Sequence, residues 1–273
     1  MFGCGTTPIF ADRLTDSLKR AVLNSDLAAV RKAIAAGANP KNIPSILAYA
    51  CDDTKADYPV CDVQIALLLI SHGADVNARD RDGTTPLIDL AFVNDPSTVP
   101  VAKALLAHGA KLGLRDSDGR TALEEAVVNN ATELFEFLTH YPFDVNDRDK
   151  SDKSMLMWAC WQGPADESKG NPNVDLARFL VRDGADVNAH TKDGRTPLMW
   201  LARVDPEFES EAIVVAKDLV KHGARVDMRN SHGKTAFQVA YANGLRKLAR
   251  YLRSVENGKK LFGIDSAASL KLR

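Results

Sequence analysis

A motif that recurs along the chain constrains its fold more than any other feature. The clearest copy reads Asp-Val-Asn-Ala-Arg-Asp-Arg-Asp-Gly-Thr-Thr-Pro-Leu and occupies residues 75–87. In this copy and its weaker relatives, the equivalent glycine position recurs at steps of 36, 33, 42 and 39 residues and falls on Gly83, Gly119, Asp152, Gly194 and Gly233. A period near 33 residues predicts an array of stacked repeats, not a closed globule with one active-site cleft.

The residues that follow the motif predict short helices with defined ends. Thr85 and Thr196 suit the N-cap of a helix, and each is followed by a proline at the first helical position, where its missing N–H costs nothing. The same capping position holds Ser45, Thr121, Ser154 and Thr235. Glycines suited to close a second helix are Gly37, Gly73, Gly109, Gly184 and Gly223. Each repeat is therefore expected to be a helix–turn–helix unit that buries its apolar face by stacking on its neighbours.

This pattern resembles the ankyrin repeat, Asp-x-x-Gly-x-Thr-Pro-Leu-His-x-Ala-Ala followed by a second helix and Gly-Ala-Asp-Val-Asn. The resemblance covers roughly residues 12–256, and its internal spacing makes it specific. It implies an all-α ankyrin-repeat solenoid of about seven helix–turn–helix repeats, with the first and last acting as caps. Short β-hairpin fingers are expected near residues 79–82, 115–118 and 192–194. Residues 1–11 are expected to form an N-terminal extension, and residues 257–273 a flexible C-terminal tail.

Several repeats depart from the family spacing. Insertions between the first and second helix occupy residues 52–62, 94–100, 162–173 and 205–211. They are rich in Pro, Asp, Ser, Gly and Asn, which predicts longer turns or helix extensions. They either form a secondary recognition edge or reflect neutral variation of surface loops. Pro142 replaces the usual closing glycine of the fourth repeat, which predicts an irregular helix end.

Charge and composition exclude several kinds of partner. The chain has 35 basic and 36 acidic residues and a net charge of −1, which argues against a nucleic-acid or anionic membrane surface. The basic last helix is better explained as the solvated face of a terminal cap. No apolar run approaches the roughly 18–20 residues that span a bilayer. We therefore expect a monomer that binds a protein partner and has no transmembrane segment.

Catalytic motifs are missing from the sequence. It contains no Gly-rich phosphate loop, no Gly-x-Ser-x-Gly, no His-Glu-x-x-His and no Cys-x-x-Cys. All six histidines have positions that the repeat explains, several of them near helix C-termini, where the helix dipole favours them. We therefore expect no enzymatic activity, no cofactor and no metal.

The resemblance also identifies residues that face the concave groove, at four, seven and eight positions after the capping residue. In the fifth and sixth repeats these are Trp158, Trp161, Gln162, Trp200, Arg203 and Val204. In the third and fourth repeats they are Asp89, Phe92, Val93, Glu125, Val128 and Asn129. The partner-binding residues that we predict are Trp158, Trp161, Trp200, Arg203, Phe92, Asp89 and Glu125, together with the finger residues Arg79, Arg81, Arg115 and Lys192.

All three tryptophans of the chain belong to this set. An aromatic cluster of this kind has the composition of an interface hot spot, so we predict a partly exposed concave patch that contacts the partner. The alternative is that Trp158 and Trp200, each preceded by methionine, pack the first helices of adjacent repeats together. Trp161 is the least explained by such packing.

The cysteines leave the compartment open. Cys160 holds a small-residue helix position and is expected in the core. Cys51 and Cys61 bracket one insertion and are expected to have Cα atoms within about 7 Å, compatible with a disulfide in an oxidising compartment. Gly3-Cys4-Gly5 resembles a bacterial lipoprotein cleavage point, but the basic and apolar regions of a signal are absent. As written, the chain is expected to be cytoplasmic; a periplasmic or lipid-anchored location is the alternative if an upstream signal is missing.

The function that these features favour is a non-catalytic protein–protein interaction module, of bacterial origin, that holds its partner with groove and fingers. A scaffold, an inhibitor or immunity-type protein and an effector all fit this description. The alternative is a periplasmic accessory protein that protects or stabilises a specific enzyme. The fold alone does not name the partner.

Overall fold

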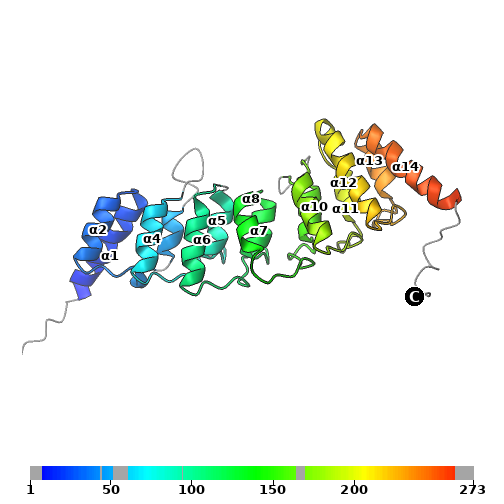
Figure 1. Ribbon diagram of the computed structural model, residues 1–273. Helices are drawn as coiled ribbons and strands as arrows, with labels where there is room; N and C mark the ends of the chain where they lie inside the picture. The colour runs from blue at the N-terminus through cyan, green and yellow to red at the C-terminus, as the bar shows by residue number, and fades with distance from the viewer. Residues whose placement is uncertain (1–7, 44, 52–60, 94, 164–169, 262–273) are drawn as a thin grey trace, which may run out of the picture. The chain divides into compact units, whose positions relative to one another are not determined.

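The computed structural model describes residues 8–43, 45–51, 61–93, 95–163 and 170–261 (Figure 1). The chain divides into two compact units, residues 1–143 and residues 144–273. Each unit is a stack of helix pairs, and the two are described in turn.

Unit 1 contains four helix pairs. They are α1 (Pro8–Leu23) with α2 (Leu27–Ala35), α3 (Ile46–Ala50) with α4 (Val63–Ser71), α5 (Pro86–Val93) with α6 (Thr98–Ala107), and α7 (Ala122–Val128) with α8 (Thr132–Leu138). A short 3-10 turn, η1 (Pro40–Asn42), joins the first two pairs. The first helices contact one another in the order α1, α3, α5, α7, and the second helices in the order α2, α4, α6, α8. The apolar core lies between these two layers and includes Leu18, Val22, Ile46, Leu69, Leu87, Leu90, Leu105 and Leu134.

Unit 2 repeats the arrangement with three pairs. They are α9 (Met155–Cys160) with α10 (Val174–Arg182), α11 (Pro197–Leu201) with α12 (Glu209–Lys221), and α13 (Ala236–Ala242) with α14 (Arg246–Leu261). The 3-10 turn η2 (Pro206–Phe208) precedes α12. One layer contains α9, α11 and α13, and the other contains α10, α12 and α14. Core residues between the layers include Leu156, Leu180, Leu198, Leu201, Leu219, Leu245 and Leu252.

The seven pairs confirm the expected helical repeats, although both end boundaries differ. Helix α1 begins at Pro8, inside the segment expected to be an extension, because proline suits the first helical position. Helix α14 continues to Leu261, beyond the expected limit of 256, and includes Gly258. A glycine in a helix interior costs only about 1 kcal/mol, so it does not end a helix by itself. The rest of the predicted tail, residues 262–273, lies outside the described residues.

The predicted helix caps are largely confirmed. Thr121 and Thr235 each form a capping box with the residue three positions later, and the Ser154 hydroxyl accepts a hydrogen bond from the Met157 N–H. Ser45 and Thr196 also hold the predicted N-cap positions, but neither side chain makes a capping bond. Ser45 has a left-handed backbone and donates its hydroxyl to the Arg79 carbonyl oxygen instead.

The predicted closing glycines also behave as expected. All five have positive φ values, from 81° at Gly73 to 100° at Gly37. In the fourth repeat, where Pro142 stands in place of glycine, α8 ends at Leu138 without a left-handed residue after it.

The fingers lie where the sequence places them, but they are tight turns and not β-hairpins. The Asp80 N–H donates to the Thr84 carbonyl at 3.1 Å, and the Asp116 N–H donates to the Arg120 carbonyl at 3.0 Å. Among the described residues the only β-pairing consists of isolated bridges, such as the one between Arg148 and Ser154. The turns are held instead by a side chain at their first position: Asp80 Oδ1 accepts from two backbone N–H groups, at 2.8 and 3.0 Å.

Neighbouring fingers approach each other closely. Within unit 2, the Ser231 N–H donates to the Asp193 carbonyl at 2.8 Å, and a Cβ added at Gly194 would lie 3.0 Å from the Cα of Asn230. Gly194 also has a φ of +76°, so this position requires glycine for two reasons. The equivalent Asp152 keeps the same left-handed backbone, with a φ of 63°.

Asparagines of the Asp-Val-Asn segments join each repeat to the next. Within unit 1, Asn77 donates to the Gly109 carbonyl at 3.0 Å and accepts from the Lys111 N–H at 2.8 Å. Asn146 and Asn188 make the same pair of bonds within unit 2. These bonds satisfy backbone groups left open at helix ends, and they fix the register of adjacent repeats.

The insertions lie between first and second helices, as predicted. Two of them partly extend the second helix, since α6 begins at Thr98 and α12 at Glu209. In unit 2 two insertions are hydrogen-bonded to each other, because the Asp205 N–H donates to the Gly170 carbonyl at 2.8 Å. Residues 52–60, 94 and 164–169 lie outside the described residues, so the recognition role proposed for the insertions stays a prediction.

The predicted proximity of Cys51 and Cys61 is confirmed. The two residues form a disulfide, both are buried, and their Cα atoms are 3.9 Å apart. Next to them, the Asp62 N–H donates to the Ala50 carbonyl at 2.8 Å, which closes the base of the insertion. In the described part of the chain no helix is both long and apolar enough to cross a bilayer.

Candidate functional site

A groove with a volume of about 750 Å³ opens on unit 1, and we refer to it as the unit 1 groove. Three consecutive repeats line it. Helices α3, α5 and α7 contribute Tyr49, Asp89, Phe92 and Glu125, and the fingers contribute residues 79–82, 116–118 and Arg120. The groove therefore combines two aromatic rings with a high density of charged side chains.

Five of the predicted partner-binding residues meet in this groove: Arg79, Arg81, Asp89, Phe92 and Glu125. The three helical residues do so because α5 includes the fourth and seventh positions after its capping threonine and α7 includes the fourth. The two arginines lie on the finger before α5. The Phe92 side chain is 36% exposed, and both arginines are exposed, whereas Glu125 is buried at the base. The sequence therefore placed these five residues on one surface.

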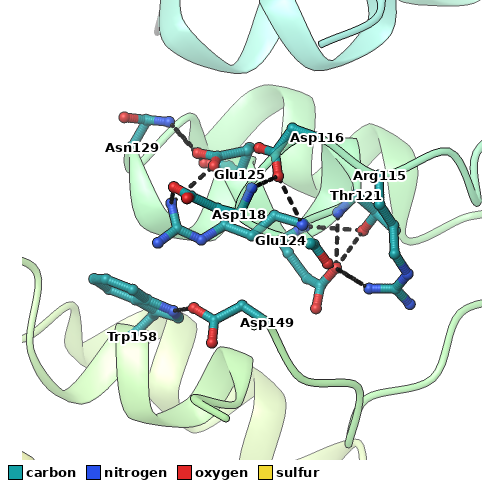
Figure 2. A network of polar contacts seen from close by, with 11 residues as sticks. Arg115, Asp116, Asp118, Thr121, Glu124, Glu125, Asn129, Asp149 and Trp158 are labelled. Carbon is teal, nitrogen blue, oxygen red and sulfur yellow. Dashed lines mark hydrogen bonds and ion pairs between the residues drawn. The ribbon is translucent and has the colours of Figure 1, made fainter. Parts of the chain in front are cut away.

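Glu125 is the most unusual group of the groove (Figure 2). Its two carboxylate oxygens accept hydrogen bonds from Arg120 Nη1 and from Asn129 Nδ2, each at 2.8 Å. Burial raises the pKa of Glu125 to about 7, and the Asp116 carboxylate reinforces this shift. The Arg120 guanidinium opposes it but is outweighed. The side chain therefore changes charge near neutral pH.

The neighbouring Glu124 has a structural task. One of its oxygens accepts from the Thr121 N–H at 2.8 Å and completes the capping box of α7. The same oxygen accepts from Arg115 Nη1 at 3.2 Å (Figure 2). Arg115, predicted to bind a partner, is thus partly occupied by this ion pair and does not line the groove.

The three tryptophans form one cluster in unit 2. The ring centroids of Trp158 and Trp161 are 6.2 Å apart, and those of Trp161 and Trp200 are 5.2 Å apart. Trp158 also donates its indole N–H to Asp149 Oδ2 at 3.0 Å (Figure 2). The predicted clustering is confirmed.

The predicted exposure of this cluster was wrong. Trp158 is 7% exposed, and Trp161 and Trp200 are each 1% exposed. The prediction assumed that the first helix continues through the seventh position after its cap. Helix α9 ends before that position, at Cys160, so Trp161 follows the helix with an extended backbone and turns into the core. The alternative interpretation, that the tryptophans pack adjacent repeats together, is the one that their burial favours.

Gly163 and Gly170, which belong to the described ends of the insertion at 162–173, lie against the Trp161 ring. A Cβ added at Gly163 would lie 2.5 Å from Cζ2 of that ring, and one added at Gly170 would lie 2.8 Å from its Nε1. Both distances are too short for any side chain, so the two glycines allow the loop to contact the indole. The described ends of an insertion that the sequence suggested as a recognition edge therefore pack against the core of their own repeat.

A buried lysine lies among the three rings. The Lys153 ammonium is 4.2 Å from the ring centroid of Trp158, 4.4 Å from that of Trp200 and 5.4 Å from that of Trp161. The backbone N–H of Lys153 donates to Asp149 Oδ1 at 2.9 Å. Asp149 therefore makes hydrogen bonds to both the finger turn and the Trp158 indole. A desolvated cation over an indole face contributes on the order of 2 kcal/mol.

The two other residues predicted in unit 2 lie at its surface or edge. Arg203 is half-buried, with its guanidinium carbon 5.6 Å from the Trp200 ring centroid. Helix α11 ends at Leu201, so Arg203, seven positions after the cap, lies beyond the helix that the prediction assumed would reach it. Lys192 is exposed on the finger that begins at Thr191.

The histidines at helix ends form hydrogen bonds to the backbone. His72, His108, His140 and His222 each place Nδ1 between 2.8 and 2.9 Å from the carbonyl oxygen four residues earlier. Across the described residues no group of three or more His, Cys, Asp or Glu side chains could hold a metal ion.

Sequence reasoning missed Lys153 and the acidic residues of the fingers. The acidic residues could have been recognised from the sequence, because an aspartate recurs three residues before the glycine position, as Asp80, Asp116 and Asp149. Lys153 left none, because it stands at a position before the capping residue where Thr84, Arg195 and Lys234 occur elsewhere.

Comparisons with known proteins agree with this architecture. The family model described as "Ankyrin repeats (3 copies)" matches residues 60–149, 97–188 and 156–261. Among solved structures, the chain is similar to the crystal structure of the ankyrin repeat domain of Bcl-3, described as a unique member of the IkappaB protein family. The two are 25% identical with a TM-score of 0.61, over 86% of this chain and 97% of that one. No curated protein sequence matches the chain.

We predict that replacing Trp161 by Ala lowers the free energy of unfolding by roughly 3–5 kcal/mol, as expected for a large buried ring. Chemical denaturation of the purified variant measures the loss. The matched control is Tyr241→Ala, because Tyr241 is an aromatic residue of the same unit that is 57% exposed. A loss below about 1 kcal/mol for Trp161→Ala would contradict the burial of the ring.

We also predict that Glu125 makes unfolding depend on pH. Its pKa in the folded protein is about 7, above the ordinary value of 4.5, so the folded state retains a proton that the unfolded chain has released. This stabilisation is complete below about pH 4.5 and disappears as the pH rises through about 7. The difference in free energy of unfolding between the wild type and Glu125→Gln should therefore fall between pH 5 and pH 8.

Urea denaturation at several pH values measures this difference. Glu133→Gln is the control, because Glu133 is exposed on the adjacent helix α8 and the substitution removes the same charge. The assignment of a raised pKa to Glu125 would be contradicted if the free energy of unfolding of the wild type minus that of Glu125→Gln stayed constant or rose with pH.

Proposed function

Because the chain belongs to the ankyrin repeat family, we propose that it is a non-catalytic module that binds a protein partner through the unit 1 groove and the fingers beside it. One observation carries the proposal: five residues chosen from the sequence as partner contacts line a single open groove. The known role of ankyrin repeats in protein–protein interaction supports the same function.

The groove has features that favour tight binding. Phe92 presents an exposed aromatic ring between charged neighbours, and aromatic and arginine side chains are enriched at the energetic centres of interfaces. The fingers are held in place before any partner binds, since the Ser117 N–H donates to the Asp82 carbonyl at 2.8 Å and Arg79 donates to the Arg115 carbonyl. Binding to a preorganised surface loses less conformational entropy.

In unit 2 we propose that the exposed Lys192 contacts the partner, with Arg203 at the edge of the same repeat. The buried tryptophans contribute indirectly, by holding α9 and α11 at a fixed separation. The molecule acts as a monomer in this proposal. A scaffold, an inhibitor or immunity-type protein and an effector are the roles that fit such a module.

Affinity capture from cells that express the protein tests the proposed function. The wild type should retain a specific partner, and Phe92→Ala should lose at least nine-tenths of it, because truncation of a hot-spot aromatic costs about 2 kcal/mol or more. Tyr241→Ala, which removes another exposed aromatic ring, should retain the partner. Equal recovery with Phe92→Ala and the wild type would contradict binding at the unit 1 groove.

A second function, an accessory protein that protects or stabilises an enzyme in the periplasm, is favoured by the disulfide between Cys51 and Cys61. Disulfides persist in oxidising compartments and are rare in the cytosol. The bond also joins the two ends of the insertion between α3 and α4. One of its cysteines, Cys51, lines the groove.

Thiol labelling in the native cell separates the two compartments. If the protein works in an oxidising compartment, Cys51 and Cys61 should resist alkylation under denaturing conditions until a reductant is added, whereas the free Cys160 should react at once. Immediate alkylation of all three cysteines would contradict the accessory function.

A further inference from the structure

Resting on the proposed function, we infer that the unit 1 groove binds a cationic segment of the partner protein, whose arginine or lysine side chains lie against its acidic wall. The inference names the chemistry of the partner, which the proposed function leaves open. It follows from the excess of carboxylates in the groove, from the contacts that two of its arginines make within the protein, and from its aromatic rings.

The groove is locally acidic in a chain that is nearly neutral. Its charged lining comprises six carboxylates, from Asp80, Asp82, Asp89, Asp116, Asp118 and Glu125, and three guanidinium groups, from Arg79, Arg81 and Arg120. The whole chain has 35 basic and 36 acidic residues, so this imbalance is a property of the groove and not of the general surface. A cationic partner would complement it.

Two of the three arginines in the groove make contacts within the protein, and the third, Arg81, is exposed. Arg120 is held by Glu125 at 2.8 Å and by Asp118 at 3.6 Å, and Arg79 donates to the Arg115 carbonyl. Asp82 and Asp118 are exposed at the tips of adjacent fingers, and Asp118 remains exposed although Arg120 lies 3.6 Å away. Two carboxylates thus face solvent on the same wall, where arginine or lysine side chains of a bound segment can reach them.

The aromatic residues of the groove suit the same partner. Arginine and lysine combine a charged end with an aliphatic stem, and the stem packs on apolar surface while the charge remains at the rim. Phe92 offers an exposed ring for such a stem. Tyr49 already has a cation over its ring, since the Lys19 ammonium lies 4.9 Å from the centroid. A small-molecule pocket would be predominantly apolar, which this groove is not.

Glu125 makes the affinity depend on pH. Arg120 and Asp116 interact with it from the finger and Asn129 from the end of its own helix, and Asp89 of α5 lines the same groove, while Glu133 and Glu136 of α8 are exposed to solvent. Its pKa near 7 means that the groove gains a negative charge as the pH rises from 6 to 8. A segment that remains cationic throughout this range should therefore bind more tightly at pH 8.

Peptide selection tests the inference with a defined probe. Random 12-residue peptides displayed on phage are selected on the immobilised full chain, and the enriched sequences are synthesised with a fluorescent label. We expect them to be enriched in arginine and lysine over the unselected library. Their affinity, measured by fluorescence anisotropy, should fall on addition of 0.5 M NaCl, because added salt screens exposed charges.

Two matched double variants locate the site. Asp82→Asn with Asp118→Asn removes the exposed carboxylates of the groove and should weaken binding about tenfold or more. Asp12→Asn with Asp16→Asn removes the same charge from exposed positions on α1, outside the groove, and should change the affinity less than twofold. Circular dichroism and thermal unfolding verify that both variants are folded.

The outcomes separate the inference from the proposed function. Peptides without excess basic residues that bind Phe92→Ala weakly, but bind the Asp82→Asn/Asp118→Asn variant normally, would overturn the inference and leave the groove as the binding site. A selection that yields no peptide sensitive to Phe92→Ala would contradict both. Basic peptides that bind Glu125→Gln with the same pH dependence as the wild type would overturn the role of Glu125.

Discussion

Burial of apolar helix faces by stacking is the constraint on which the rest of the structure depends. The first helices of the repeats have only five to eight residues from α3 onward, too few to be stable alone. Each gains its stability from the helices before and after it, as the contacts of α5 with α3 and α7 illustrate. The turn geometry serves this stacking: aspartates hold the fingers, asparagines such as Asn77 join consecutive repeats, and left-handed glycines end the second helices.

The same repeat position has opposite uses in the two units. Four residues after the cap, unit 1 has Asp89 and Glu125, whereas unit 2 has Trp158 and Trp200. In unit 1 these residues line an open groove, and helices of seven or eight residues hold them toward it. In unit 2 the first helices α9 and α11 have six and five residues, and Gly163 and Gly170 lie against the Trp161 ring. An open groove and sealed packing are thus alternative results of one scaffold.

Local signals made the repeats predictable, and long-range packing limited the prediction of the site. The caps at Thr121 and Thr235 and the closing glycines act within a few residues, so the sequence located each helix pair. Whether a helix continues to the seventh position depends on the loop that follows it, which is why Trp161 was misplaced. Lys153 was missed for a related reason, since a lysine is buried only where tertiary structure supplies several aromatic rings.

The claim that a partner binds the unit 1 groove is tested most directly by photocrosslinking from Phe92. Benzoylphenylalanine placed at position 92 should form a covalent adduct with the partner on irradiation, because this ring is exposed within the groove. The same group at position 241, which is also exposed but does not belong to the groove lining, should form little or none. An adduct from position 241 with none from position 92 would contradict the account.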